Sequence, residues 1–242
     1  MSCIFLSYHA LLSSMKDRFA NNLMILNGQI AEACQTCNRD VDDITIIAVT
    51  KTFPSAAIQI AVASGVFNIG ESRLQDAEPK IIELGQIARY HMIGHLQSNK
   101  VKKTVDLFDV IQSVDTLKLA EEISKRAGEA NRTIECYVEV NSSGEEQKNG
   151  VAISETVEFM KQINQLPHIK LSGLMTIGPH TDDEKRIRDA FQSCNALFKE
   201  GHQIVGDTFS NLSMGMSSDF KIAIQEGSTM IRVGTGLFGD RG

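Results

Sequence analysis

Lys51 stands at the end of an apolar, β-branched run that begins at Ile44, and Pro54 follows it shortly. Such a run is typical of a strand buried on both faces, and a proline cannot continue the ladder of a sheet. Lys51 is therefore predicted at the mouth of the sheet, where desolvation would lower the pKa of its amine. A neutral amine there can attack a carbonyl to form a Schiff base. The alternative is a lysine whose amine reaches solvent at a strand end.

A second group of residues suited to chemistry lies near the C-terminus. Gly234, Thr235 and Gly236 follow the last predicted strand, and Ser217 opens the helix after the preceding one. Glycine allows close approach to the backbone, and N–H groups and hydroxyls donate hydrogen bonds. Barrels bind phosphate at this place. The glycines alone could be ordinary turns, so the prediction depends on a closed barrel that brings Lys51 to them.

An amine for an aldehyde and donors for a phosphate are what pyridoxal phosphate requires of a protein. Arg232, just before the glycine turn, would then reach the pyridine nitrogen. A guanidinium cannot accept a proton, so it would keep that nitrogen unprotonated and make the cofactor a weak electron sink. The alternative for Arg232 is a surface ion pair, which contributes about 0–1 kcal/mol.

The elements that must position these groups alternate along the chain. A long amphipathic helix is predicted from Leu11 to Cys37, and eight apolar strand-like runs separated by helical patterns follow. The predicted strands span 44–51, 66–69, 90–93, 110–113, 134–140, 171–177, 209–214 and 230–233. This α/β alternation in a chain of ~250 residues predicts a single (β/α)8 TIM barrel with an extra N-terminal helix. A doubly wound sheet is the rival, but no G-x-G-x-x-G motif follows the first strand.

Composition limits the classes of partner. The 242 residues are 42% hydrophobic and 22% charged, with a net charge of -6, which suits one domain over 1–242 with 1–14 as a loose extension. Without a basic stripe or an apolar run of ~18 residues, we expect no nucleic acid and no membrane span. Five cysteines indicate reduced thiols in the cytoplasm. Cys34 and Cys37 lack the second pair that a zinc site needs, so we expect no metal.

Barrel active sites lie at the C-terminal ends of the strands. There the sequence places polar or small residues: Lys51, Gly70, Glu71, Ser72, His95, Asn141, Met216, Ser217, Gly234 and Thr235. We expect His95 to be a loop residue without a partner that would make it an acid or base. Asp115 is predicted to cap the helix that runs to Ala130.

Six stretches of the chain carry a resemblance to a known family. They are 48–52, 70–71, 91–100, 173–175, 212–217 and 227–235. Through them the chain resembles the pyridoxal phosphate homeostasis protein family, which is similar to the N-terminal barrel domain of alanine racemase. The resemblance runs from about Met15 to the C-terminus.

The resemblance implies that pyridoxal 5'-phosphate is bound covalently, as an internal aldimine with Lys51. It further implies Arg232 near the pyridine nitrogen and Ser217, Gly234 and Thr235 on the phosphate. Ser72 and Met216 complete the predicted cofactor-binding set. Ser72 stands where the family usually has asparagine, and His95 where it usually has proline.

The function implied by the resemblance is homeostasis of pyridoxal phosphate without established catalytic turnover, so we expect a monomeric binding protein rather than an enzyme. Apo-enzymes that use the cofactor are the expected recipients. Alternatives are a small racemase, an aldolase, or an interaction protein that uses the barrel only as a scaffold. A racemase needs acid and base groups on both faces of the substrate carbon. In related racemases one comes from a second domain, which we expect this chain to lack because it ends soon after its last strand.

Overall fold

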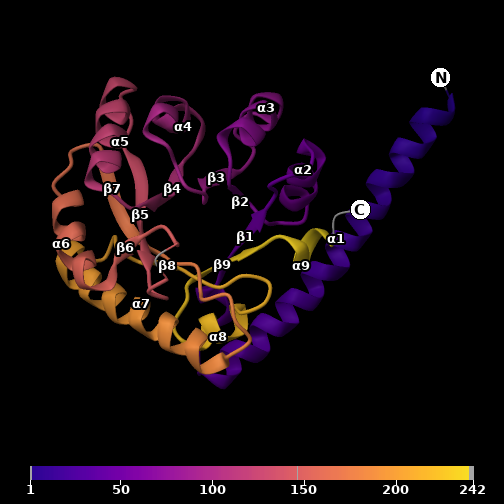
Figure 1. The fold of residues 1–242 in the computed structure, drawn as a ribbon. Helices are drawn as coiled ribbons and strands as arrows, with labels where there is room; N and C mark the ends of the chain where they lie inside the picture. Colours follow the sequence, from indigo (N-terminus) through magenta and orange to yellow (C-terminus); the bar gives the residue numbers. More distant parts are fainter. Residues whose placement is uncertain (1, 146, 240–242) are drawn as a thin grey trace.

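The computed structural model describes residues 2–145 and 147–239, with the side chains of residues 2–12 left aside. Eight parallel strands close into a ring, so the predicted (β/α)8 barrel with an N-terminal helix is confirmed (Figure 1). Around the ring the strands are β1 (Thr45–Val49), β2 (Asn68–Glu71), β3 (Arg89–Met92), β4 (Val110–Val114), β5 (Ile134–Asn141), β7 (Ile169–Met175), β8 (Asn211–Ser213) and β9 (Met230–Val233). Among the residues that the structure describes, the two-residue strand β6 (Val151–Ala152) pairs with β5 alone.

Helices surround the ring of strands (Figure 1). They are α1 (Ser2–Thr36), α2 (Ser55–Ala63), α3 (Leu74–Leu84), α4 (Val101–Leu107), α5 (Leu117–Glu129), α6 (Ile153–Ile163), α7 (Glu184–Val205), α8 (Phe220–Gln225) and α9 (Thr235–Phe238). Short 3-10 turns, η1 (Val41–Asp43) and η2 (Ser98–Lys100), precede β1 and α4. Helix α1 begins well before the predicted Leu11, because no Gly or Pro interrupts the chain between Ser2 and that residue. The assignment of 1–14 as a loose extension stays a prediction.

The cap of α5 differs from the prediction. Thr116, and not Asp115, is the N-cap residue, and its hydroxyl accepts from the backbone N–H of Leu119 at 3.3 Å. Asp115 instead directs its carboxylate toward His95 at the barrel mouth, with 3.6 Å between Oδ2 and Nδ1. Both residue types can cap a helix, so their order along the chain did not decide between them.

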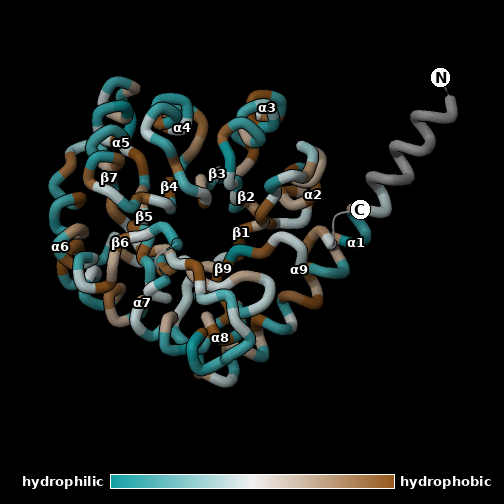
Figure 2. Tube along the Cα trace, viewed as in Figure 1, coloured by the Kyte–Doolittle hydropathy of each residue, from teal (hydrophilic) through white to brown (hydrophobic). Residues whose placement is uncertain are grey.

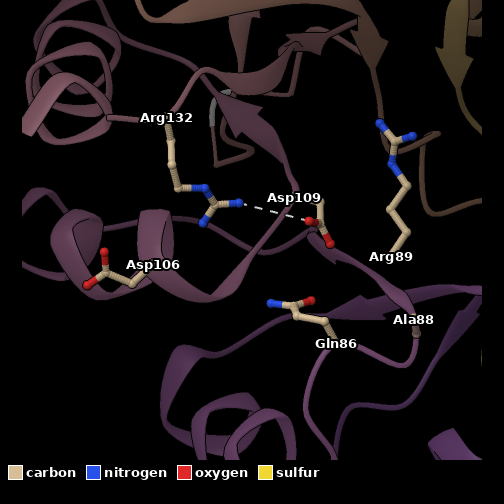
Figure 3. Close-up of a pocket in the computed structure, with 6 residues that line it drawn as sticks. All are labelled: Gln86, Ala88, Arg89, Asp106, Asp109 and Arg132. Carbon is tan, nitrogen blue, oxygen red and sulfur yellow. Dashed lines mark ion pairs between the residues drawn. The ribbon is translucent and has the colours of Figure 1, made fainter. Parts of the chain in front are cut away.

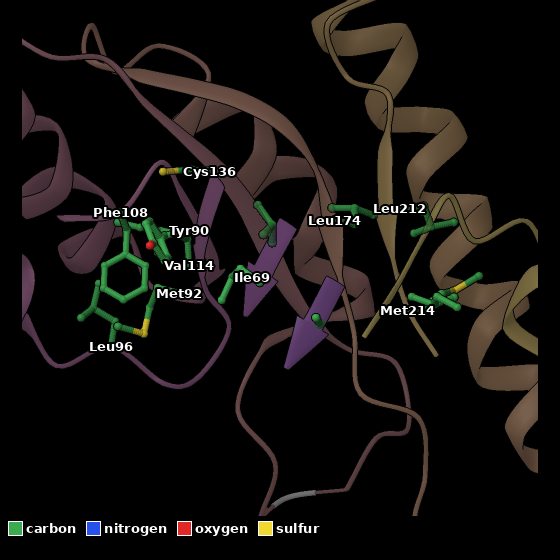
Figure 4. Close-up of a cluster of buried hydrophobic side chains, with 14 of the residues drawn as sticks. Ile69, Tyr90, Met92, Leu96, Phe108, Val114, Cys136, Leu174, Leu212 and Met214 are labelled. Carbon is green, nitrogen blue, oxygen red and sulfur yellow. The ribbon is translucent and has the colours of Figure 1, made fainter. Parts of the chain in front are cut away.

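Two apolar layers hold the barrel together. An inner cluster lies inside the ring and consists of Ile47, Val49, Val110, Tyr137, Met175 and Met230. A larger outer cluster lies between the strands and the helices, and includes Ile69, Met92 and Leu174 (Figure 4). Figure 2 shows hydrophobic residues gathered on the strands and hydrophilic ones on the outer turns of the helices. Strands buried on both faces follow from this arrangement, which explains their nearly continuous apolar sequences.

Helix α1 packs against the last turn of the chain. The ring of Phe19 lies 5.0 Å from that of Phe238, measured between centroids, and Phe238 lies 4.8 Å from Phe53. The Asn22 side-chain amide donates to the carbonyl of Leu237 at 3.0 Å. Aromatic packing at such distances contributes about 0.5–1.5 kcal/mol per pair beyond the area buried. These contacts connect α1 to the turn after β9 and to the turn after β1. Those two turns carry the predicted site.

A buried ion pair holds the turn that carries Lys51. Lys80 of α3 lies 2.5 Å from Glu71 Oε1, and the same carboxylate oxygen accepts from the Thr50 hydroxyl at 2.6 Å. The Lys80 ammonium also donates to the carbonyls of Thr50 at 3.0 Å and Phe53 at 3.2 Å. Those two residues close the turn, since the N–H of Phe53 donates to the Thr50 carbonyl.

The turn itself has a backbone conformation that side chains rarely adopt. Thr52 has φ of 66°, in the left-handed region, where a β-branched residue is an outlier. Such strain costs on the order of 1–3 kcal/mol and persists only where the surroundings impose it. The Lys80–Glu71 pair supplies that constraint and thereby fixes the residue next to Lys51.

We expect Lys80→Met to lower the free energy of unfolding by about 3–5 kcal/mol, because it leaves the fully buried Glu71 carboxylate without its cation. Lys103→Met is the matched control, since Lys103 pairs with Glu78 at the surface, and it should cost less than about 1 kcal/mol. Urea denaturation of both variants measures the difference. Equal effects of the two substitutions would contradict the structural role given to Lys80.

Candidate functional site

All seven residues predicted from the sequence line a single cavity of about 480 Å³ at the C-terminal ends of the strands. They are Lys51, Ser72, Met216, Ser217, Arg232, Gly234 and Thr235. The remaining wall includes the apolar side chains Val49, Phe53, Ile93 and Ile177. A cavity of this size, with an apolar wall and a few polar groups, is typical of a small-molecule site. The structure thus brings the predicted residues together, while their role in binding a cofactor stays a prediction.

Lys51 differs from the expectation in one respect. The residue is exposed and lies in the turn beyond β1, whereas we expected a desolvated amine. The reason is that β1 ends at Val49, so that Lys51 stands on the rim of the cavity and not inside the barrel. Lys51 is therefore exposed to solvent and also lines the cavity, so a ligand that enters from outside can reach it.

Three hydrogen-bond donors meet in the neighbouring turns after β8 and β9. The Ser217 hydroxyl lies 3.4 Å from the Thr235 hydroxyl and 3.4 Å from the backbone N–H of Gly236. A β-carbon added to Gly236 would lie 2.8 Å from Val233 and 3.4 Å from the Ser217 hydroxyl, so a side chain here would force Val233 to move. Hydroxyls and backbone N–H groups suit the oxygens of a phosphate.

Ser217 lies in a turn, whereas we expected it to open a helix. Helix α8 begins at Phe220, and the Asp219 carboxylate holds the turn by accepting from the backbone N–H of Met216 at 2.6 Å. Burial raises the pKa of Asp219 above its ordinary value. Its hydrogen bond to Met216 orders the segment that carries Ser217, so the position of the hydroxyl depends on this carboxylate.

Arg232 is buried, with 4% of its surface exposed, and is not the surface residue that the alternative interpretation required. Its Nη1 donates to the carbonyl and to the hydroxyl of Ser213, both at 2.8 Å, and its Nη2 donates to the carbonyl of Thr176 at 2.8 Å. Burial lowers the pKa of Arg232 to about 10, partly offset by the carboxylates of Asp219 and Glu139. The guanidinium therefore stays charged at neutral pH.

A close approach of two backbone segments forms another part of the wall. A β-carbon on Gly94 would lie 2.2 Å from the carbonyl oxygen of Ser72, which leaves no room for any side chain. The loops after β2 and β3 consequently touch, and Ser72, Ile93 and Gly94 face the same cavity.

Three polar residues predicted at strand ends do not line this cavity: Asn141, His95 and Glu71, the last of which pairs with Lys80. Asn141 orders its own loop: its amide donates to the carbonyl of Glu145 at 2.9 Å and accepts from the N–H of Gly144 at 3.1 Å. His95 points to Asp115, so our expectation that His95 has no partner is wrong. Asp115 follows β4, and the sequence gives no sign that these two strand ends meet.

Glu139 is a candidate that sequence analysis missed. It lies on β5, is 6% exposed, and is close enough to Asp115 and Arg232 for their charges to act on it. Burial raises the pKa of Glu139 to about 7, the Asp115 charge adds to the rise, and the Arg232 charge opposes it. The sequence did carry a signal for this residue, since Glu139 is a carboxyl within the apolar run of the predicted strand 134–140. At neutral pH this group changes charge beside the arginine of the site.

We expect the stability of the protein to fall as pH rises from about 4.5 to about 7 because of Glu139. Its folded-state pKa lies above the ordinary 4.5, so the folded state binds the proton more tightly and stability is lost as the group ionises. The effect is on the order of 3 kcal/mol. Unfolding by urea at several pH values should show a smaller slope in Glu139→Gln than in the wild type. The raised pKa values of Asp115 and Asp219 remain in both proteins.

Glu121→Gln, at an exposed position on α5, is the control and should keep the slope of the wild type. A Glu139→Gln protein with an unchanged slope would contradict the raised pKa.

Another cavity lies away from the residues of the candidate site. A cavity of about 650 Å³ is lined by Gln86, Ala88, Arg89, Asp106, Asp109 and Arg132 (Figure 3). Arg132 and Asp109 pair across it at 3.9 Å. Ala88 and Asp109 precede β3 and β4, so this cavity lies toward the N-terminal ends of the strands, where barrel enzymes do not place their chemistry.

Within the described ranges, no three His, Cys, Asp or Glu side chains are grouped as a metal ion would need. None of the helices that the structure describes combines the length and apolar character of a membrane span.

Known proteins share both the sequence and the fold. The family model of the alanine racemase N-terminal domain matches residues 26–242. A protein of Pasteurella multocida (strain Pm70) named pyridoxal phosphate homeostasis protein is 36% identical over 224 residues, which cover 91% of this chain and 96% of that protein. PipY of Synechococcus elongatus PCC7942, solved with PLP bound, is 36% identical with a TM-score of 0.75, over 87% of this chain and 100% of PipY.

Alanine racemase from Corynebacterium glutamicum has a TM-score of 0.74 at 14% identity, over 93% of this chain and 61% of the racemase, and shows the fold alone. The match to the domain family and the relatives above 30% identity extend over most of the chain. This chain therefore belongs to the pyridoxal phosphate homeostasis protein family, which has the barrel of the alanine racemase N-terminal domain.

Proposed function

We propose that this protein binds pyridoxal 5'-phosphate in the cavity at the strand ends and holds it as a Schiff base with the Lys51 amine. One observation carries the proposal: Lys51 after β1, and Gly234 and Thr235 after the adjacent strand β9, line one cavity. The amine and the groups proposed to hold the phosphate therefore follow neighbouring strands. The PLP-bound relative PipY supports the same ligand.

The donor set fits the parts of this cofactor. Ser217, Thr235 and the N–H groups of the 234–236 turn would hold the phosphate, and the apolar residues Ile93 and Ile177 would cover the ring. When bound, pyridoxal phosphate supplies an aldehyde that an amine can capture and a ring that can withdraw electrons. Arg232 donates hydrogen bonds only, so it would leave the pyridine nitrogen unprotonated and weaken that withdrawal.

A homeostatic role agrees with the position of the site at the surface. Lys51, Ser217 and Thr235 are all exposed on the rim, so the cofactor could be taken up and given back without opening the barrel. Ser72 and Met216 would border it on the remaining sides. In this proposal a monomer in the cytoplasm stores the cofactor without catalytic turnover and supplies it to apo-enzymes.

The purified protein with added pyridoxal phosphate should show an absorbance band near ~420 nm that Lys51→Ala abolishes. Ser217→Ala should raise the Kd for the cofactor by about 10- to 100-fold, because it removes a hydrogen bond to a charged group. Ser210→Ala, an exposed serine at the other end of the barrel, is the control and should leave the Kd unchanged. Binding that needs neither Lys51 nor Ser217 would refute the assignment of this cavity.

A small amino-acid racemase is the second candidate, and Glu139 is the observation that favours it. A carboxyl with a pKa near 7 beside Arg232 could exchange protons at neutral pH. Against it, Glu139 is not among the residues that line the cavity.

We expect no exchange of the Cα proton when the loaded protein is incubated with amino acids in deuterated water, measured by NMR. Exchange that is lost in Lys51→Ala would favour the racemase over the binding protein. Lys103→Met, at a distant surface lysine, controls for exchange caused by free cofactor and solvent-exposed amines.

A further inference from the structure

A chain of polar side chains crosses the interior of the barrel below the site. It runs from Arg232 through Ser213, Gln112 and His91 to Asn68, and so connects β9, β8, β4, β3 and β2. The Ser213, Gln112 and His91 side chains have no exposed surface. Buried polar groups are costly unless they are paired, so a fully connected chain in a barrel core calls for an explanation.

Every hydrogen bond in this chain points the same way. A guanidinium can only donate, so the Ser213 hydroxyl accepts from Arg232 at 2.8 Å and must use its single proton elsewhere. That proton goes to Gln112 Oε1 at 2.8 Å. The amide of Gln112 is thereby oriented, and its Nε2 donates to His91 Nδ1 at 3.0 Å and to the sulfur of Met230 at 3.4 Å.

His91 completes the chain as a neutral ring. Because Nδ1 accepts from Gln112, the ring proton is on Nε2, which donates to Asn68 Oδ1 at 3.0 Å. Burial lowers the pKa of His91 to about 3, with a contribution from the nearby Arg89 charge, so the ring stays neutral throughout the physiological range. Asn68 lies at the N-terminal opening of the barrel, in a cavity lined also by Arg89 and Lys170.

We infer that Gln112 and Ser213 are positioning residues for Arg232, and that this one-way chain fixes the plane of its guanidinium. Of the five N–H groups of Arg232, three are used by Ser213 and Thr176. The two that remain are Nε–H and one on Nη2, and they are the ones available to a ligand in the cavity. The inference rests on the proposed function for the identity of that ligand, whereas the ordering of Arg232 is a property of the chain itself.

The role of each variant follows from the donor pattern. Gln112→Met keeps the shape of the side chain but removes the acceptor for Ser213 and the donor to His91. Ser213→Ala removes the hydroxyl on Arg232, and Ser213→Thr retains it. Ser113→Ala is the matched control, because Ser113 is a buried serine beside Gln112 whose hydroxyl has no hydrogen-bond partner among the described residues.

The first measurement is hydrogen exchange of the Arg232 guanidinium protons by NMR, without cofactor and assigned with Arg232→Lys. We expect exchange about tenfold faster in Ser213→Ala, the effect of losing one hydrogen bond to a charged group. Exchange should also be faster in Gln112→Met, because the Ser213 hydroxyl then loses the acceptor that orients it toward Arg232. Ser213→Thr should restore slow exchange and Ser113→Ala should not change it. Unchanged exchange in both Gln112→Met and Ser213→Ala would overturn the inference, and two variants guard against one that fails to fold.

The second measurement is titration with pyridoxal phosphate. Gln112→Met and Ser213→Ala should raise the Kd about tenfold and shift the absorbance band, and Ser113→Ala should do neither. If the wild type binds the cofactor and both variants match its Kd and band, the positioning role is overturned while the proposed function stands. If the wild type binds no cofactor, the proposed function fails, and the exchange rates alone decide whether the chain orders Arg232.

Discussion

The parallel pairing of β9 with β1 closes the barrel, and the candidate site depends on this closure. In that pairing Ile47 lies opposite Arg232 and Ala48 opposite Val233, so the turns that follow the two strands leave the sheet side by side. One turn carries Lys51 and the other carries Gly234 and Thr235. Residues from the two ends of the chain thus meet without any domain movement, as expected where active-site loops follow adjacent barrel strands.

Each of these turns is held by its own contacts below the rim. The Lys80–Glu71 pair fixes the first, and the bonds from the N–H groups of Leu237 and Phe238 to the Gly234 carbonyl fix the second. Phe238 contacts both α1 and the first turn, so the two supports are linked. The exposed turns that carry the site are therefore held by buried contacts beneath them. Such support preorganises a binding site.

Two buried ionisable groups, Arg232 and Glu139, lie near each other at the barrel mouth. Arg232 is a buried cation whose donors are mostly taken by backbone and side-chain oxygens, while Glu139 lies near it as a carboxyl that titrates close to neutral pH. Full ionisation of both would place an ion pair in a region of low dielectric, where desolvation opposes the Coulomb attraction. The hydrogen-bonded chain through Ser213 supplies the order that an ion pair would otherwise provide.

The fold and the members of the site could be predicted because their signals are local. Apolar runs, glycine turns and a lysine at a strand end are visible in short windows, and the closed barrel then determines which of them meet. The last strand was predicted with its observed bounds, from Met230 to Val233.

The residues that support the site could not be predicted in this way. Lys80 contacts the Thr50 turn from α3, the second helix after that turn, and His95 pairs with Asp115 between the ends of β3 and β4. Whether a strand residue faces the core or the helices depends on register, and the pairing of β5 with β7 shifts between Cys136 and Tyr137, just before Glu139. The exposure of Lys51 depended on β1 ending two residues earlier than its apolar run suggested.

The central claim is that the amine of Lys51 is the group that captures pyridoxal phosphate. Reduction of the loaded protein with borohydride would make that bond permanent, and peptide mass spectrometry would then locate the phosphopyridoxyl group. The account predicts that the group is on Lys51. A group found on another lysine, or no labelled peptide from a protein that does bind the cofactor, would contradict it.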